Sequence, residues 1–308
     1  MNASAYSPSC PSTPKRAGPL RRAHIIIWIF GLALVAGLRA AAQAQLADEP
    51  RAIFVMNRDG SDVCRVVFVE TFPQLGAPRW SHDGLRLAFD ARSSRPTRAL
   101  VVDASGRNLI DLGSGTRPDW SPDDKQVVFE VPNVGRASIW VQNADGRGNS
   151  WLCPGSAPRW SPDGSRIAMC GPLRVFDVLS GRHQDLASDL SEVGEAIGCD
   201  WSPDGSQLAV VVKRGPSHEL ILMGATRDAK PPRVRLRAQL SGAAAFSPDG
   251  KHLAVTIHDP KLQAHRLHLL AVEGDDPPLP IPGQVGDNRD PAFSPDGKRL
   301  AFASTRDP

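Results

Sequence analysis

The chain repeats one arrangement of polar and apolar positions. A short polar phrase with the character of a turn is followed directly by three or four apolar residues. These apolar runs are unbroken rather than alternating, which is typical of strands that are buried on both faces. We therefore predict buried strands at 87–89, 127–129, 167–169, 208–211, 253–255 and 300–302.

A second set of apolar runs lies between the phrases, and most of these runs end at Gly or at Asn-x-Asp-Gly. An apolar run that stops at such a turn signal indicates a strand that enters a hairpin. Weaker strand signals follow at 66–69 and 233–236. The second set comprises 53–56, 100–102, 139–141, 175–178, 220–223 and 267–270.

The polar phrase itself occurs six times as aromatic-Ser-x-Asp, at spacings of 40 to 47 residues. A period of about 40–45 residues is that of the four-stranded blades of β-propellers. Ser-Pro-Asp-Gly suits a type I turn, because Pro presets φ and Gly takes the left-handed position. Two copies depart from it, with His82 in place of Pro and Asp124 in place of Gly. The aromatic and Asp positions are Trp80 and Asp83, Trp120 and Asp123, Trp160 and Asp163, Trp201 and Asp204, Phe246 and Asp249, and Phe293 and Asp296.

The order of the two kinds of element predicts how a ring would close. The repeat region begins with a hairpin and ends with a phrase. We therefore expect an all-β, six-bladed propeller of four-stranded blades, in which 53–69 completes the blade begun by 293–302. Such closure leaves only short outer edges.

The first 44 residues differ from the rest of the chain. A basic segment precedes the apolar run 25–38, and Ala-Gln-Ala ends at Ala44. This is the pattern of a secretory signal, with an uncleaved signal anchor as the alternative. We expect a leader at 1–44, a propeller at 45–308 and a periplasmic or secreted location, or an inner-membrane anchor without cleavage. The formal charge of +3 then divides into five basic residues of the leader and a remainder of 31 basic against 33 acidic residues. No basic surface is left to predict a nucleic-acid partner.

The phrase resembles the TolB-type, WD-like propeller repeat, Pro-x-Trp-Ser-Pro-Asp-Gly followed by a strand. Pro stands before the aromatic at Pro78, Pro118, Pro158 and Pro291, whereas Cys199 and Ala244 replace it in two copies. The resemblance covers nearly all of 51–308 and implies the TolB propeller without its N-terminal α/β domain. It also implies a protein-binding platform in the periplasm of a bacterium, with a role like that of the Tol-Pal system.

One set of repeat-equivalent positions suggests a binding site. The residues directly before the aromatics are Arg79, Asp119, Arg159, Asp200, Ala245 and Ala292. Equivalent positions of a propeller form a ring about its axis, so Arg and Asp would alternate over four blades with a small apolar gap. The ring is either a girdle of salt bridges between blades or a polar funnel that takes a peptide segment.

Other candidate chemistry is weak. No nucleophile elbow, metal-binding His pair or phosphate-binding loop occurs, so we expect no catalytic residue, cofactor or metal. The repeated Asp residues are expected to cap turns rather than to bind Ca²⁺. The cysteines of the predicted propeller allow three disulfide pairings or buried thiols, and the sequence does not choose among them. They are Cys64, Cys153, Cys170 and Cys199.

These patterns favour an exported, non-enzymatic propeller that acts as a monomer and binds a protein or peptide, and the resemblance implies that the partner belongs to a bacterial envelope. Membrane contact is expected only through an uncleaved leader. The alternatives are a propeller enzyme, such as a lyase or hydrolase on envelope or plant polymers, and an accessory or sensor module of a separate hydrolase.

Overall fold

The computed structural model describes residues 50–93, 96–133, 136–186, 194–226 and 232–306. The predicted leader lies outside the described residues. The chain divides into residues 1–49 and the unit Pro50–Pro308, and the second unit is the one described here. Among the described residues, no helix is long and apolar enough to span a membrane.

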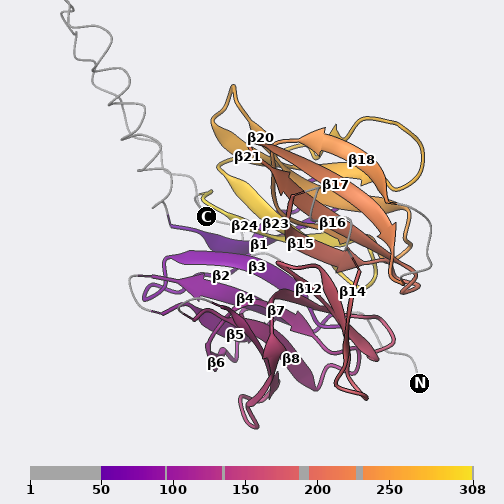
Figure 1. The fold of residues 1–308 in the computed structure, drawn as a ribbon. Helices are drawn as coiled ribbons and strands as arrows, with labels where there is room; N and C mark the ends of the chain where they lie inside the picture. Colours follow the sequence, from indigo (N-terminus) through magenta and orange to yellow (C-terminus); the bar gives the residue numbers. More distant parts are fainter. Residues whose placement is uncertain (1–49, 94–95, 134–135, 187–193, 227–231, 307–308) are drawn as a thin grey trace, which may run out of the picture. The chain divides into compact units, whose positions relative to one another are not determined.

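The second unit consists of six four-stranded antiparallel sheets. Their first strands contact one another in a ring, so each sheet is one blade of a propeller (Figure 1). The strands of each blade are given from the axis outwards. Blade 1 is formed by β3 (Gln74–Trp80), β4 (Arg86–Arg92), β5 (Arg98–Asp103) and β6 (Ile110–Ser114). Blade 2 is formed by β7 (Thr116–Trp120), β8 (Gln126–Val131), β9 (Ser138–Asn143) and β10 (Ser150–Pro154), and blade 3 by β11 (Ser156–Trp160), β12 (Arg166–Cys170), β13 (Arg174–Asp177) and β14 (His183–Asp185). Blade 4 is β15 (Glu195–Trp201), β16 (Gln207–Arg214), β17 (Ser217–Gly224) and β18 (Arg233–Ala238), and blade 5 is β19 (Leu240–Phe246), β20 (His252–Asp259), β21 (Ala264–Ala271) and β22 (Leu279–Pro280).

Blade 6 joins the two ends of the described chain. Its strands are β23 (Asn288–Phe293), β24 (Arg299–Ser304), β1 (Ala52–Asn57) and β2 (Cys64–Val67). β1 pairs with β24 along its whole length, from Ala52 opposite Ser304 to Asn57 opposite Arg299. In Figure 1 the indigo strand β1 accordingly lies beside the yellow strand β24. The six-bladed fold and its predicted closure are both confirmed.

The core lies between the blades. The second strand of each blade is packed on both sides, as its unbroken apolar run predicts, and its central residue is fully buried. In five blades this residue is Ala, whose small size permits close approach of the next blade. These residues are Ala88, Ala168, Ala209, Ala254 and Ala301.

Each innermost strand contains a β-bulge at a similar place in its blade. In each of them the pairing register shifts within the five residues before the motif aromatic, for example between Gly76 and Arg79 and between Ser156 and Arg159. In four blades the residue three positions before the aromatic has a left-handed backbone. These residues are Ala77, Arg117, Ala157 and Asp290, with φ of 46°, 52°, 47° and 54°. Left-handed conformations are costly for residues other than Gly. The bulge also explains the Pro that stands two positions before the aromatic in four blades, since a strand tolerates Pro where a ladder hydrogen bond is missing.

Candidate functional site

The four charged ring residues stand on the innermost strands of blades 1 to 4. Arg79 Nε lies 4.0 Å from Asp119 Oδ1 on the neighbouring blade. Arg79 Nη1 lies 3.6 Å from Asp200 Oδ1 of blade 4, on the opposite side of the ring. Arg79 therefore crosses the axis and meets two carboxylates.

Burial dominates the electrostatics at this level. Removal from water, with the nearby charge of Arg159, lowers the pKa of Arg79. Burial also raises the pKa of Asp200, against the attraction of the two arginines. Both shifts have the sign expected when charged groups leave water.

The ring carboxylates also hold the backbone of the next blade. Asp119 Oδ2 accepts the Trp160 N–H at 2.8 Å, and Asp200 Oδ2 accepts the Phe246 N–H at 2.8 Å. Each acid thus joins two neighbouring innermost strands. This half of the ring has the bonds that the girdle interpretation requires.

Arg159 lacks such bonds. Its side chain is buried, its Nη1 donates to the Pro158 carbonyl at 2.8 Å, and its Nε has no partner. Among the described residues, no carboxylate lies within 4.0 Å of its nitrogens. The alternation of Arg and Asp along the sequence therefore does not give an alternation of ion pairs.

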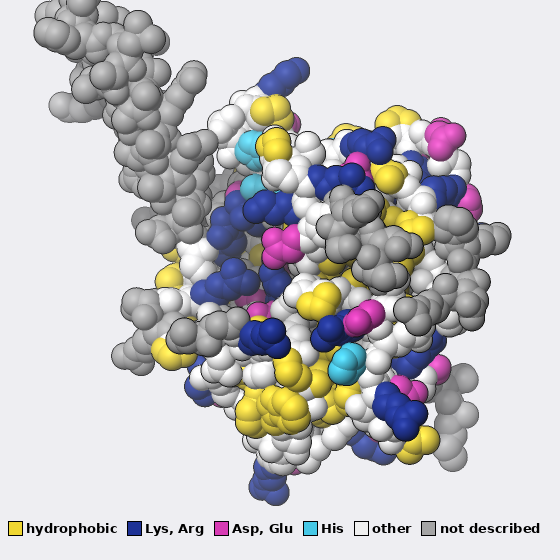
Figure 2. Space-filling model, in the orientation of Figure 1, with side chains coloured by type: hydrophobic (Ala, Val, Ile, Leu, Met, Phe, Trp, Pro, Cys, Tyr) yellow, Lys and Arg dark blue, Asp and Glu magenta, His cyan; other side chains and the backbone are white. Residues whose placement is uncertain are grey.

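A cavity of about 200 Å³ opens along the axis beside this ring. All six blades contribute to its wall, mostly through the beginnings of their innermost strands. One part of the wall is formed by small residues of blades 4 and 5, namely Gly198, Ser241, Gly242 and Ala243. Figure 2 shows dark-blue Lys and Arg side chains gathered around a hollow in the face of the propeller. The arginines that line the cavity are Arg51, Arg92, Arg117, Arg159 and Arg289.

Acidic side chains hold the bulges of this wall in place. Asp90 accepts the N–H of Arg117 at 3.1 Å, and Glu130 accepts the N–H of Ala157 at 3.0 Å. Asp290 accepts the N–H of Ala77 at 3.2 Å. In each case a side chain of one blade fixes the left-handed turn of the next blade.

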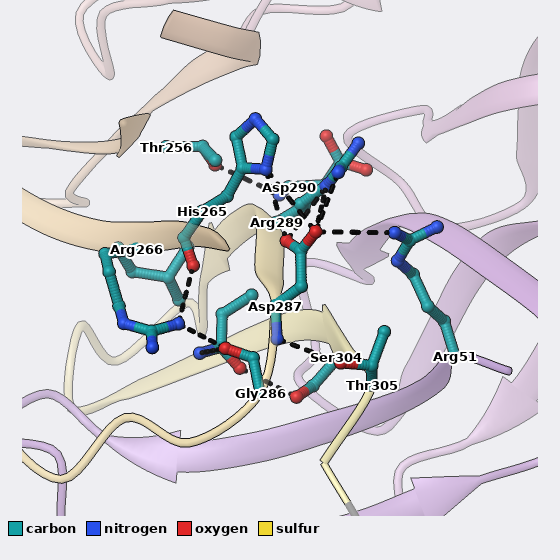
Figure 3. A network of polar contacts seen from close by, with 12 residues as sticks. Arg51, Thr256, His265, Arg266, Gly286, Asp287, Arg289, Asp290, Ser304 and Thr305 are labelled. Carbon is teal, nitrogen blue, oxygen red and sulfur yellow. Dashed lines mark hydrogen bonds and ion pairs between the residues drawn. The ribbon is translucent and has the colours of Figure 1, made fainter. Parts of the chain in front are cut away.

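Asp287 is the centre of a charged network at the edge of the cavity (Figure 3). Its carboxylate lies 3.5 Å from Arg51 Nη2, 2.7 Å from Arg289 Nη2 and 3.3 Å from His265 Nδ1. Burial alone would raise the pKa of Asp287, but the hydrogen bonds and charges of His265 and Arg289 lower it well below its usual range. The network holds Arg51 and Arg289 of the cavity wall in place, and the Asp287 carboxylate that contacts His265 also binds both arginines.

The repeated Asp residues cap the turns at the other end of the innermost strands. In the third copy, Asp163 Oδ1 accepts the Ser161 hydroxyl at 2.5 Å and the Ser165 N–H at 3.0 Å. These bonds lower the pKa of Asp163 to about 2. The Ser–Asp bond recurs in all six copies, at 2.5–2.7 Å. In each copy the turn thus uses the Oδ1 atom of the Asp, and no group of three or more possible metal ligands gathers within the part of the chain that the structure describes.

The two departures from the turn sequence lie against each other. Asp124 occupies the Gly position with φ of 57°, and its carboxylate accepts the N–H groups of His82 and Asp83 at 2.7 and 2.8 Å. In the other turns, the place of Asp124 is taken by a Gly next to the Pro of the preceding turn, as with Gly164 and Pro122. Where the turn consensus has a Pro and a Gly in contact, His82 and Asp124 therefore form a polar contact between blades 1 and 2.

The motif aromatics mainly fill the spaces between blades. Trp120, Trp201 and Trp80 are buried, and each is covered by an Arg from the preceding blade at 4.5 to 5.1 Å. Phe246 and Phe293 are buried as well, whereas Trp160 is half-buried. The aromatic positions thus belong to the interfaces between blades and not to the wall of the cavity.

The thiols of two cysteines meet between blades 3 and 4. Cys170 on β12 and Cys199 on β15 are both buried and lie in one apolar cluster. A hydrogen bond with the Cys170 thiol, together with burial, raises the pKa of Cys199. The structure has all four cysteines of the propeller as thiols without a disulfide, and of the three pairings open from the sequence the one that includes Cys170–Cys199 has a contact between two of its thiols.

The sequence reasoning missed most of the cavity wall. The bulge residues three positions before the aromatic form a second set of equivalent positions, and they include Arg117 and Asp290. Aligning the repeats at this position as well would have found them. Arg51 and Arg92 carry no such signal, because they lie at strand ends outside the repeated phrase.

No protein-family model and no curated protein sequence matches the chain. Solved structures do resemble it. TolB from Acinetobacter baumannii superposes with a TM-score of 0.67 at 19% identity, over 83% of this chain and 70% of that one. A protein assigned as TolB in Agrobacterium tumefaciens gives 0.66 at 19% identity, over 83% and 98%. Hydrazine synthase of Kuenenia stuttgartiensis gives 0.55 at 19% identity, over 77% and 75%. At these identities the similarity concerns the fold, and the chain has the six-bladed propeller fold of the TolB structures that its repeat resembles.

Proposed function

We propose that the chain is an exported, non-enzymatic propeller that binds a segment of another protein of the bacterial envelope at its axial cavity. The observation that carries the proposal is the cavity itself. All six blades build it, and it combines fixed arginines with a wall of small residues. Binding sites of this kind are concave, largely preformed and equipped with a few convergent polar groups.

The likeness of the fold to TolB structures, the predicted leader and the position of the cavity support the same proposal. The bulges add a physical argument. Backbone strain of about 1–3 kcal/mol per left-handed residue persists only where the surroundings enforce it, and such strain gathers at functional sites. Four non-Gly residues of the cavity wall, Ala77, Arg117, Ala157 and Asp290, have this conformation.

The test is affinity capture from an envelope fraction, followed by mass spectrometry. Ser241→Trp places a bulky side chain in the wall of the cavity, and Ser150→Trp on the outermost strand β10 is its matched control. We expect a partner that the wild type and the control capture and that Ser241→Trp loses. A partner captured equally by all three proteins would place binding elsewhere on the molecule. Failure to enrich any protein would contradict the binding function.

A further inference from the structure

Among the described residues, Arg159 has no ion-pair partner within 4.0 Å. Its side chain is only 5% exposed, its Nε has no hydrogen-bond partner, and its Nη1 reaches a carbonyl oxygen rather than an acid. A buried charge without a partner is strongly unfavourable, which is why buried charges in proteins are paired. Arg159 lines the cavity.

The neighbouring acids are committed to other groups. Asp119 and Asp200 are both directed at Arg79 and both accept a backbone N–H. Glu130 lies 3.6 Å from Arg117 Nη1 and accepts the Ala157 N–H. In each of these carboxylates one oxygen is held by a backbone N–H of the next innermost strand. The charge of Asp200 attracts Arg159 as well as Arg79, but among the described residues no carboxylate lies within 4.0 Å of the Arg159 nitrogens.

A second arginine of the cavity also has a buried donor without a partner. Arg51, whose guanidinium is held by Gln74 and Asp287, also lines the cavity, and its Nε is buried without a partner. The cavity thus has two guanidinium groups with free donor capacity, both anchored by neighbouring residues. Guanidinium groups favour carboxylates, whose two oxygens match their planar set of donors.

The size of the cavity limits what can enter. Pockets for drug-sized ligands measure about 300–1,000 Å³, and this cavity measures about 200 Å³. It suits one side chain or one chain end and not a folded surface. The wall is closely packed at Gly242, where a Cβ would lie 2.5 Å from Asp290 Oδ1, so a larger residue does not fit there.

We infer that the cavity is a carboxylate-binding site, in which Arg159, with Arg51, receives an acidic side chain or the C-terminal carboxylate of a bound peptide. This inference rests on the proposed function and names the chemistry that its partner must present. The carboxylate replaces the counter-ion that Arg159 lacks within the chain.

The direct test uses three short peptides and measures binding by calorimetry or by NMR of the arginine Nε–H groups. The first is N-acetyl-Gly-Gly-Asp-Gly-Gly-amide, and the second is its Asn counterpart. The third is N-acetyl-pentaglycine with a free C-terminal carboxylate. We expect at least one carboxylate peptide to bind about tenfold or more tightly than the Asn peptide, which is the factor that a charge-assisted hydrogen bond provides. The Asp peptide and the free C-terminus distinguish the two sources of the carboxylate.

Arg159→Gln should reduce the affinity for the carboxylate peptide to that of the Asn peptide. Arg98→Gln is the matched control, because Arg98 pairs with Asp111 on the outer strands of blade 1 and loses the same charge. Equal affinities for the Asp, Asn and C-terminal peptides, preference for a carboxylate that survives in Arg159→Gln, or no binding at all would each overturn the inference.

The free protein supplies a second readout. If Arg159 serves a ligand, removing its charge relieves an unpaired buried group, so the unfolding midpoint of Arg159→Gln should equal or exceed that of the wild type. A clearly lowered midpoint would mean that Arg159 stabilises the ring and would contradict the inference. The carboxylate peptide should raise the midpoint of the wild type and not that of Arg159→Gln.

Capture from the envelope fraction separates this inference from the proposed function. A partner lost by Ser241→Trp but retained in full by Arg159→Gln would leave the binding function standing and refute the carboxylate site. A wild type that enriches no partner would refute the proposed function, whatever the short peptides do.

Discussion

At the scale of single residues, charge in this propeller is organised by burial. The same arginine and acid types form exposed pairs at the blade edges, such as Arg174 and Asp185, and buried networks at the cavity, such as that of Asp287. Exposed pairs contribute about 0–1 kcal/mol, because water and salt screen them. A buried carboxylate that loses its charge leaves its arginine partners unpaired. Protonation of the cavity carboxylates should therefore account for most of the loss of folding stability at low pH.

Asp287→Asn tests this difference. The folded-state pKa of Asp287 lies below its ordinary value, so the carboxylate contributes stability that is fully present above about pH 4 and is lost as pH falls below it. We expect the variant to be less stable than the wild type in urea unfolding at pH 7 and the difference to narrow below about pH 4. Asp185→Asn on β14 should change little at either pH. A difference that stays constant from pH 7 to pH 3 would show that the charge of Asp287 is not involved.

The motif tryptophans differ in burial, and replacing the more deeply buried ones by Ala should cost more folding stability. Trp120 is 1% exposed and donates its Nε1–H to the Arg79 carbonyl, whereas Trp160 is half-buried and has no partner for its Nε1. We expect Trp120→Ala to cost about 3–5 kcal/mol by leaving a cavity, and Trp160→Ala to cost less. Chemical denaturation of both variants checks the order. Equal costs would mean that side-chain burial is not what separates the two sites.

At the scale of elements, the turns work in pairs. The carboxylate of Asp124 supports the turn at His82, where Pro is missing. Asp124→Gly removes two charge-assisted hydrogen bonds, each of which is worth about 1.5–3 kcal/mol, but relieves the left-handed conformation of a non-Gly residue. We expect a net loss of stability in this single variant.

The double variant His82→Pro with Asp124→Gly restores the repeat consensus and should recover much of that loss. A double-mutant cycle on unfolding free energies measures the recovery, since residues in contact are not additive. Strict additivity of the two substitutions would show that the turns do not support each other.

The elements also show where sequence reasoning succeeds. The second and third strands of each blade are unbroken apolar runs, and their buried positions agree with the prediction. The innermost strands were not predicted as strands, since segments such as Thr116–Trp120 contain Arg, Pro and Asp and have little β propensity. Their bulges and the acids that cap them override propensity. Position in the repeat predicts one ring that holds Arg79 and Asp200. Only the fold shows that Asp119 and Asp200 both lie within 4.0 Å of Arg79, whereas no carboxylate of the described residues lies that close to Arg159.

At the scale of the whole molecule, stability depends on closure of the ring. Each blade buries its faces against two neighbours, so an incomplete sixth blade would expose apolar surface on blades 1 and 5 and leave β24 as an open edge. Open edges of this kind invite pairing with other chains. A propeller therefore differs from an open array of repeats, in which loss of a terminal unit leaves the others largely intact.

Two truncations test closure directly. Removing residues 1–44 takes away only the predicted leader, and we expect a single cooperative melting transition. Removing residues 1–70 also takes away β1 and β2, whose partner β24 is then unpaired on one side. We expect this shorter chain to lose cooperative unfolding and to aggregate, because blade 6 would keep two of its four strands and the clusters on both sides of it would be opened. Calorimetry with analytical ultracentrifugation measures both effects. If the two truncated chains melt at the same temperature with the same cooperativity, the N-terminal strands do not hold the ring together, and closure by blade 6 is not a source of its stability.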